Sequence, residues 1–334
     1  MEGIEEISLA EMEGFRIGHA QNHRAGTGCS VIIPEGGAAG GVDVRGGAPG
    51  TRETDLLKPG NLAEKINAVL LTGGSAFGLA AADGVMKYLE ERGSGFAAGE
   101  FSVPLVPAAV LFDLNCGEGK VRPDRKMGYQ ACLKAASDQQ LNGNYGAGTG
   151  ATVGKYAGQE KAMKAGIGQF IYRCGEVKIG VLAAVNCLGD VYDPESCRLI
   201  AGARTKNKNR NEFLAEEDRE AFIRLASARD AGNFTSGNTV LAAVFTNARL
   251  SPSKASRLAG ICHDAIARTV RPSHTMLDGD TIFVLARGPV EADLSLLAAL
   301  GVEAATRAII RAVKRAESAY GFSGYADLSE IEDK

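Results

Sequence analysis

The chain has 334 residues, of which 45% are hydrophobic and 23% are charged, and its formal net charge is −3. This composition is typical of a globular protein with a substantial core, and it excludes the basic field that a nucleic-acid partner requires. No apolar run approaches the ~18 residues of a membrane span, and the acidic start lacks the positive charge of a signal peptide. We therefore expect a cytoplasmic protein with no nucleic-acid or membrane partner.

The cysteines and glycines carry different information. Seven cysteines are scattered along the chain and are never spaced C-x-x-C, so we expect neither a disulfide framework nor a metal site, and no cofactor. Glycine is unusually frequent, with 43 residues. This number predicts many tight turns and many places where backbone approaches backbone or a ligand.

The first third of the chain predicts strands that alternate with helices. An apolar stretch at 68–72 reads as a buried strand, and Ser75 is a suitable N-cap for the helix that follows. A second apolar strand is expected at 103–113, where two prolines favour an edge or an irregular entry. A short helix is expected at about 124–136.

A glycine-rich loop at 142–155 ends in Lys155. The loop fails the phosphate-loop pattern, because Thr149 stands where the first glycine is needed and Tyr156 follows the lysine. Lys155 nevertheless places a cation where backbone can approach a ligand closely, so it is a candidate site residue. A β-hairpin with a three-residue loop is then expected at 169–185, and its second strand ends at Asn186.

The second half of the chain begins with a polar section. The basic cluster at 204–210 is interpreted as a solvated loop, and the stretch 226–237 as an exposed, cleavable connection. A buried strand at 239–245 follows, and then a helix that starts with Ser251 and Pro252. A strand at 281–286 and a long helix at about 302–319 complete a mixed α/β layered domain.

The triplet Gly237-Asn238-Thr239 stands at the start of the buried strand. If the Asn238–Thr239 bond is cut, Thr239 gains a free α-amine beside its hydroxyl, and one residue then supplies both the nucleophile and the base. The same triplet is also an ordinary turn before a strand. The triplet alone does not separate these readings.

Several polar residues are candidates to converge on Thr239. Asp278 and Asp280 flank one glycine at a strand entry and are suited to hold an ammonium group, although Asp-Gly-Asp is also a common turn. Asn186 is an amide donor of the kind that stabilises the oxyanion of a tetrahedral intermediate. His263 and His274 are alternative candidates for a base, but no serine or cysteine stands in a recognised nucleophile context beside them.

The combined motifs resemble one known family. The segments Gly237–Pro252 and His274–Phe283, together with Val42–Gly47, Leu71–Leu79, Gly146–Gly148, Gly154-Lys155 and Val185-Asn186, are similar to the DmpA-type self-processing aminopeptidases and, within them, the nylon-oligomer hydrolases. The resemblance covers most of the chain. It implies a four-layer αββα sandwich that is also similar to the ornithine acetyltransferases and to the N-terminal-nucleophile hydrolases.

The resemblance also implies a single catalytic domain, 1–334, that cuts itself at Asn238–Thr239 into an α chain, 1–238, and a β chain, 239–334. These chains would stay together in a homo-oligomer, a tetramer by resemblance. Thr239 matches the nucleophile of the family and Asn186 its oxyanion-site asparagine. Lys155, Asp278 and Asp280 match the polar groups around the nucleophile.

The predicted activity is hydrolysis of amide bonds by an N-terminal threonine. The expected substrates are short peptides, amino-acid amides or ω-amino-acid oligomers. Phe112 stands where the nylon hydrolases place a tyrosine, so nylon-type cleavage does not follow from the resemblance. Acyl transfer of the ornithine acetyltransferase type and a non-catalytic ligand-binding role are the alternatives.

Overall fold

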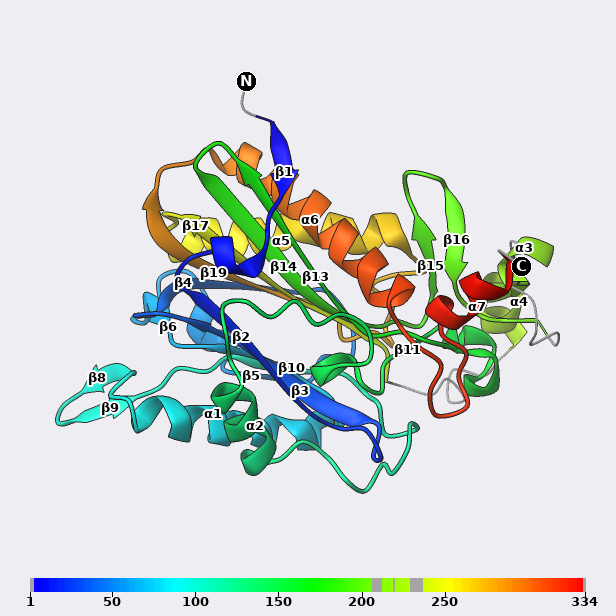
Figure 1. Cartoon of the computed structure of the whole chain (residues 1–334), viewed down its shortest axis with the longest axis horizontal. Coiled ribbons are helices and arrows are strands. Elements are labelled where there is room, and N and C mark those ends of the chain that lie inside the picture. Colours follow the sequence, from blue (N-terminus) through cyan, green and yellow to red (C-terminus); the bar gives the residue numbers. More distant parts are fainter. Residues whose placement is uncertain (1–2, 206–211, 219, 229–236, 333–334) are drawn as a thin grey trace.

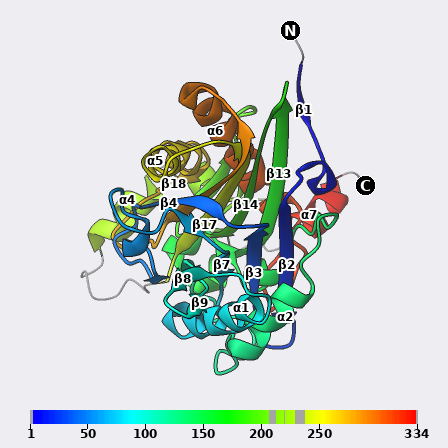
Figure 2. The same cartoon turned by 90° about the vertical axis from the view of Figure 1, so that its left-hand side faces the viewer.

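Two stacked β-sheets lie between two layers of helices in the computed structural model (Figure 1). The structure describes residues 3–205, 212–218, 220–228 and 237–332. The same layers are seen edge-on after a quarter turn (Figure 2). Within these described residues, no helix is both long enough and apolar enough to cross a membrane. The arrangement is the four-layer αββα sandwich expected from the sequence.

The larger sheet has seven strands and contains both halves of the predicted site. Its strands, in spatial order, are β1 (Ile4–Glu6), β13 (Ile167–Cys174), β14 (Val177–Asn186), β17 (Thr239–Ala248), β19 (Thr281–Val290), β4 (Ala38–Val44) and β6 (Lys65–Ile66). The expected hairpin is β13 and β14, but Cys174 pairs with Val177 and the loop has only two residues. Strands β14 and β17 are antiparallel, whereas β17 and β19 are parallel.

The smaller sheet and the helices form the remaining layers. The smaller sheet has the order β2 (Phe15–Asn22), β3 (Thr27–Pro34), β7 (Val69–Thr72), β10 (Ala108–Val110) and β5 (Thr51–Arg52). Helices α1 (Ala81–Glu90) and α2 (Arg125–Leu133) cover its outer face, and α5 (Pro252–Thr269) and α6 (Leu294–Lys314) cover the outer face of the larger sheet (Figure 1).

Strand β17 is buried on both faces, which explains why its sequence is a continuous apolar run. Val240, Ala242 and Val244 pack into the core between the larger sheet and helices α5 and α6. Leu241 and Phe245 point the other way, into the core between the two sheets. Alternate residues of a strand face opposite sides, so a strand between two cores must be apolar at every position. The residue that begins this strand therefore starts inside the protein.

Glycines let the helices approach the larger sheet closely. A Cβ atom added at Gly168 of β13 would lie 2.0 Å from the Ala308 carbonyl oxygen of α6. At Gly41 of β4 it would lie 2.3 Å from backbone atoms of Ala255 and Ser256 in α5. Real Cβ atoms do not approach backbone this closely, so these glycines set the spacing between the layers.

Several predicted element boundaries are wrong. Ser75 has a φ of +52° and caps no helix with its side chain, because a 3-10 turn, Ser75–Ala80, precedes α1. The expected strand at 103–113 is interrupted: Val103 ends β9, and only Ala108–Val110 form β10, the part that joins the smaller sheet. The two prolines lie between these strands, where proline cannot donate a ladder hydrogen bond. The long C-terminal helix begins at Leu294, capped by Asp293, well before residue 302. Ser251 caps α5 as predicted.

The smaller elements lie around the two main sheets. Most of the basic cluster and the connection before residue 237 lie outside the described residues, apart from the end of a short helix. The remaining strands and helices are β8 (Phe96–Ala98), β9 (Phe101–Val103), β11 (Thr152–Val153), β12 (Met163–Lys164), β15 (Asp190–Asp193), β16 (Arg198–Ala201), β18 (Val270–Arg271), α3 (Leu214–Glu217), α4 (Ala221–Ala228) and α7 (Tyr325–Glu332).

Candidate active site

Thr239 lies where three segments of the larger sheet meet. It begins β17 and pairs in register with Asn186, the last residue of β14. On the other side, Asn238 forms a parallel bridge with Asp278, in the loop that precedes β19. The topology therefore brings together three of the predicted catalytic residues, Thr239, Asn186 and Asp278, and the predicted cleavage bond.

The carbonyl of Asn238 contacts both a hydroxyl and a backbone amide. Thr239 Oγ1 donates a hydrogen bond to the Asn238 carbonyl oxygen, the carbonyl of the predicted cleavage bond. The backbone amide of Gly279 donates to the same oxygen at 2.8 Å. A Cβ atom at position 279 would lie 2.8 Å from Thr239 Oγ1, so glycine is required for this approach. The nucleophile candidate and a donor that polarises the carbonyl are thus in place.

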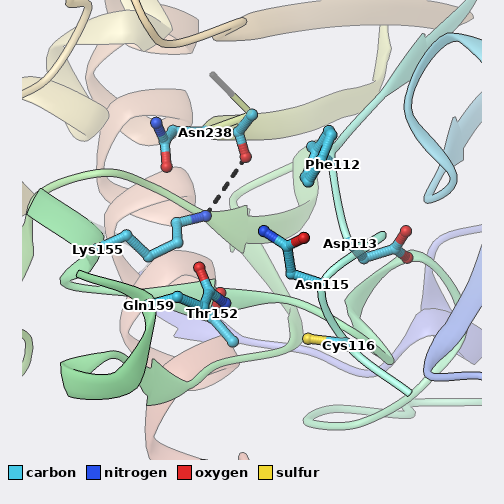
Figure 3. A pocket seen from close by; sticks show the side chains of 9 residues that line it. Phe112, Asp113, Asn115, Cys116, Thr152, Lys155, Gln159 and Asn238 are labelled. Carbon is cyan, nitrogen blue, oxygen red and sulfur yellow. Dashed lines mark hydrogen bonds between the residues drawn. The ribbon is translucent and has the colours of Figure 1, made fainter. Parts of the chain in front are cut away.

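The carbonyl of Gly237, one residue earlier, has its own pair of donors. Asn186 Nδ2 donates to it at 3.1 Å. Lys155 Nζ lies 3.5 Å from the same oxygen, the contact that the dashed line in Figure 3 marks. Asn186 Nδ2 also donates to the Phe112 carbonyl, while its Oδ1 accepts from the Thr152 amide at 2.9 Å. In the continuous chain Asn186 therefore contacts the carbonyl before the scissile one, and Gly279 contacts the scissile carbonyl itself.

Lys155 is a buried cation that points into the site. Gly154 turns the chain with a φ of +70°, and its backbone packs so closely against residues 202 and 203 that a side chain there has no room. Lys155 Nζ then reaches the carbonyl oxygen of Asn186 at 2.8 Å. Burial disfavours the charged ammonium and lowers the pKa of Lys155 to about 8. The pKa of Lys155 is therefore well below the usual value of a lysine.

Asp280 binds the strand that carries the nucleophile. Its Oδ1 accepts a hydrogen bond from the Val240 amide at 2.7 Å. Its Oδ2 accepts from the His274 amide and lies 2.8 Å from His274 Nδ1. The His274 ring stacks edge-on against His263, and burial lowers the pKa of His263 to about 4. His274 therefore supports Asp280, whereas His263 contacts the His274 ring and the Asp43 carbonyl. Among the described residues, neither histidine is hydrogen-bonded to Thr239 as a base.

Asp278 has one free oxygen inside the site. Its Oδ2 accepts from the backbone amide and the hydroxyl of Thr275, at 2.8 and 2.6 Å. Its Oδ1 is buried and has no hydrogen-bond partner among the described residues. Burial, and then the neighbouring charge of Asp280, raise the pKa of Asp278. A buried acceptor of this kind is suited to hold an ammonium group.

The first glycine-rich segment, 36–50, binds the loop that carries the two aspartates. The backbone amide of Arg45 donates to the Asp280 carbonyl at 3.0 Å, and the amide of Ala48 donates to the Asp278 carbonyl at 2.8 Å. A side chain at Gly46 would collide with the Asp278 backbone. This segment therefore positions the site without supplying a reacting group.

A small polar pocket opens beside the cleavage bond. Figure 3 shows Lys155, Asn115, Gln159 and Asn238 around it, and the ring of Phe112 closes one side. Asp113 also lines it, and burial raises the pKa of Asp113 to about 6. Within the described residues no group of three or more His, Cys, Asp or Glu side chains is arranged to hold a metal ion.

Sequence reasoning missed two contributors. Gly279 acts through its backbone amide, and a motif of side chains does not reveal such a role. The available sequence signal was the position of this glycine between the two predicted aspartates. His274 was considered only as a base, yet its contact is with Asp280. The short separation of His274 and Asp280 in the sequence was the available signal that the two side chains could be in contact.

The chain matches known proteins along almost its whole length. A model of peptidase family S58 matches residues 8–326. An uncharacterized aminopeptidase of Mycobacterium tuberculosis is 41% identical to this chain. The alignment includes 96% of this chain and 97% of that protein. The 6-aminohexanoate-oligomer endohydrolase of Paenarthrobacter ureafaciens is 30% identical, with 92% of this chain and 86% of that protein aligned.

Solved structures show the same fold. A β-aminopeptidase of Burkholderia sp. superposes with a TM-score of 0.69 at 19% identity and covers 100% of this chain and 95% of its own. The L-aminopeptidase D-Ala-esterase/amidase of Ochrobactrum anthropi superposes with a TM-score of 0.68 at 16% identity, over 98% of this chain and 93% of that chain. Its structure is described as a variant of the Ntn-hydrolase fold. The two-sheet sandwich is therefore this variant of the Ntn-hydrolase fold, and the chain belongs to peptidase family S58.

Proposed function

We propose that the protein cuts itself between Asn238 and Thr239 and that the resulting N-terminal threonine hydrolyses amide bonds. The single observation that carries this proposal is the contact of Thr239 Oγ1 with the Asn238 carbonyl, which also accepts from the Gly279 amide. The contact is to the carbonyl oxygen, and it holds the hydroxyl beside the carbonyl group whose carbon it would attack.

The processing step follows from these contacts. Thr239 Oγ1 attacks the Asn238 carbonyl carbon, the C–N bond to Thr239 breaks, and the proton lost by the hydroxyl passes to the nitrogen, which leaves as the α-amine. The Gly279 amide, 2.8 Å from the carbonyl oxygen, stabilises the negative charge that develops there. Water then hydrolyses the ester and leaves a carboxylate on Asn238 and a free hydroxyl on Thr239.

The mature enzyme repeats this chemistry on a substrate. The α-amine of Thr239, with a reference pKa of about 7.7–8.0, accepts the hydroxyl proton and returns it to the leaving amine. Asp280 fixes the following residue, Val240, and the free Oδ1 of Asp278 offers an acceptor for an ammonium group. The substrates are short peptides, amino-acid amides or linear ω-amino-acid oligomers, as the names of the relatives suggest.

Denaturing electrophoresis and N-terminal sequencing test the proposal together. We expect the 34.8 kDa chain to give fragments of about 25 and 10 kDa, and the small fragment to begin Thr-Val-Leu-Ala. Thr239→Ala should abolish cutting and amide hydrolysis, whereas Thr239→Ser, which keeps a hydroxyl, should retain both. A single uncut band without turnover, or retained activity in Thr239→Ala, would overturn the proposal.

Acyl transfer is separated from hydrolysis by adding an amine acceptor. In the presence of ornithine, a hydrolase releases the free acid, whereas an ornithine acetyltransferase-type enzyme forms acyl-ornithine from the same donor. We expect free acid as the product.

A further inference from the structure

We infer that two buried charged residues, Asp113 and Lys164, are positioning residues that hold the side-chain amide of Asn186 in one orientation. They act through the backbone on either side of this amide, which is the predicted oxyanion donor. The inference rests on the proposed function, because the orientation of an amide donor affects the rate only if Thr239 forms a tetrahedral intermediate.

The side-chain amide of Asn186 is oriented by two backbone groups. Its Nδ2 donates to the Phe112 carbonyl at 2.9 Å, and its Oδ1 accepts from the Thr152 amide at 2.9 Å. An amide turned by half a rotation would set donor against donor and acceptor against acceptor. The second hydrogen of Nδ2 meets the Gly237 carbonyl in the uncut chain. Cleavage would free this hydrogen for a substrate oxygen, while Phe112 and Thr152 keep the amide in place.

The Phe112 carbonyl is held through the side chain of the next residue. Asp113 is 3% exposed, and its Oδ1 accepts from the Gly74 amide at 2.7 Å while its Oδ2 accepts from the Thr27 hydroxyl at 2.7 Å. These bonds tie the chain beside Phe112 to the start of β3 and to the turn after β7. Figure 3 shows the Asp113 side chain directed away from Asn238, so it can position the site without reacting.

Two glycine loops enclose the Asp113 side chain. A Cβ atom added at Gly73 would collide with the Asp113 carboxylate. A Cβ atom added at Gly150 would lie 2.7 Å from Asp113 Cβ. Real Cβ atoms do not approach this closely, so both loops need glycine to close on the carboxylate. A shift of Asp113 would therefore disturb both loops, including the one that leads to Thr152.

The Thr152 amide is held by the side chain of Lys164. Lys164 is fully buried, and its Nζ donates to the carbonyls of Gly148 and Ala151 at 3.2 and 3.1 Å and to that of Ala165. An ammonium group has three donors, so each has a backbone acceptor here. Ala151 directly precedes Thr152, which pairs with Lys164 between β11 and β12. Because charged donors form stronger hydrogen bonds than neutral ones, this cation fixes the loop firmly.

The test measures inhibition by an α-aminoboronic acid, the boron analogue of an amino-acid amide. It forms a tetrahedral adduct with a nucleophilic hydroxyl, so its inhibition constant reports on the oxyanion donor and does not depend on the fraction of active molecules. In the cut enzyme, Asp113→Ala and Lys164→Met should each weaken the inhibitor by about 10-fold or more. KM for an amino-acid p-nitroanilide should change by less than about 3-fold, because the ground state makes less use of this donor.

Conservative and exposed variants serve as controls. Asp113→Asn keeps an oxygen for the Gly74 amide, and its new amide group can donate to the Thr27 hydroxyl oxygen. It should therefore restore inhibitor binding to within about 3-fold of the wild type. Asp264→Ala and Lys254→Met make matched changes at exposed positions of α5 and should leave the inhibition constant unchanged.

A double-mutant cycle shows whether Asp113 acts through Asn186. Asn186→Ala should weaken the inhibitor by itself, and adding Asp113→Ala should then cost little more. If Asp113→Ala does not fold, Thr27→Val takes its place, because it removes one of the two bonds of the carboxylate and keeps the shape of the side chain. Thr27→Val should weaken the inhibitor by about 3-fold.

The outcomes separate this inference from the proposed function. Unchanged inhibitor binding in cut Asp113→Ala, Lys164→Met or Thr27→Val overturns the inference and leaves the hydrolase intact. Additive losses in the double mutant, or unchanged binding in Asn186→Ala, overturn it as well. A wild-type chain that stays uncut, or that is cut and has no turnover, is the failure of the proposed function.

Discussion

The two flanks of the Asn238–Thr239 bond are chemically opposite. On the flank before the bond, Lys155 and Asn186 are donors that bind backbone carbonyls. On the flank after it, Asp280 is an acceptor that binds the backbone amide of Val240. Cleavage would free the segment that ends at Asn238, and with it only the contacts of these donors to the Gly237 carbonyl, because Lys155 also binds the Asn186 carbonyl and Asn186 also binds the Phe112 carbonyl. The bond from Val240 to Asp280 lies on the other side of the cut and would keep the nucleophile strand in position.

Removing the donor that has the most partners should have the largest effect. Asn186→Ala deletes hydrogen bonds to Thr152, Phe112 and Gly237 and lets the cleavage segment shift. We expect self-cleavage to slow by about 10²-fold, the cost of a misplacement of about 1 Å. The measurement is the rate at which the small fragment appears after purification. An unchanged rate with normal thermal unfolding would show that the donor flank does not position the bond.

A substitution on the acceptor flank should have a smaller effect. In Asp280→Asn, one oxygen still accepts from Val240, but the new amide group faces the backbone amide of His274, and two donors cannot pair. The unsatisfied donor should cost about 1–3 kcal/mol in the free energy of unfolding, measured by urea denaturation. Asp264→Asn, on α5 and away from these contacts, is the control. Equal stability of both variants would contradict the role of Asp280.

The approach of Gly279 to the nucleophile gives a third way to test the comparison. Gly279→Ala adds a methyl group 2.8 Å from Thr239 Oγ1 and 2.9 Å from the Ala48 carbonyl oxygen. This overpacking costs about 1–3 kcal/mol and should slow self-cleavage by about 10-fold or more. Gly3→Ala, where no atom lies within 4 Å, should cleave normally. Normal cleavage in Gly279→Ala would mean that Thr239 reacts from another position.

The smallest effect at neutral pH is expected from Lys155→Arg. Burial lowers the pKa of Lys155 to about 8, so raising the pH through 8 neutralises the ammonium and weakens its hold on carbonyls. Activity should rise with pH as the Thr239 amine loses its proton and then fall as Lys155 loses its own. In Lys155→Arg the guanidinium stays charged, and the descending limb should disappear below pH about 10. The measurement is the pH profile of kcat/KM for both enzymes. An identical descending limb in the two profiles would show that deprotonation of Lys155 does not cause it.

Much of the fold was predictable because its signals are local. The run at 239–245 and the hairpin at 169–185 have the hydrophobic patterns of buried strands, and both became central strands. The predicted Ser75 cap is wrong because a 3-10 turn precedes α1. The predicted strand at 103–113 is wrong because the prolines interrupt it, so that Val103 pairs with β8 and only Ala108–Val110 pair with β7.

The candidate site was predictable in its membership and less so in its geometry. Thr239, Asn186, Lys155, Asp278 and Asp280 are brought together, and the resemblance to family S58 explains why one sequence could name them. No sequence pattern reveals which carbonyl a side chain reaches. Only the structure places Asn186 on Gly237 and the Gly279 amide on Asn238. The self-cleavage, the role of each residue and the homo-oligomer remain predictions.

The burial of β17 on both faces has a consequence for the cut protein. Strand β17 pairs with β14 of the first segment, and β19 pairs with β4, so the two pieces would share one hydrogen-bonded sheet and two cores. Neither piece could leave without exposing the centre of the molecule. Unfolding after cleavage would release two chains, and refolding would become a second-order association that depends on protein concentration. The lifetime of the processed enzyme would therefore depend on a low rate of unfolding, because reassembly of separated chains is disfavoured.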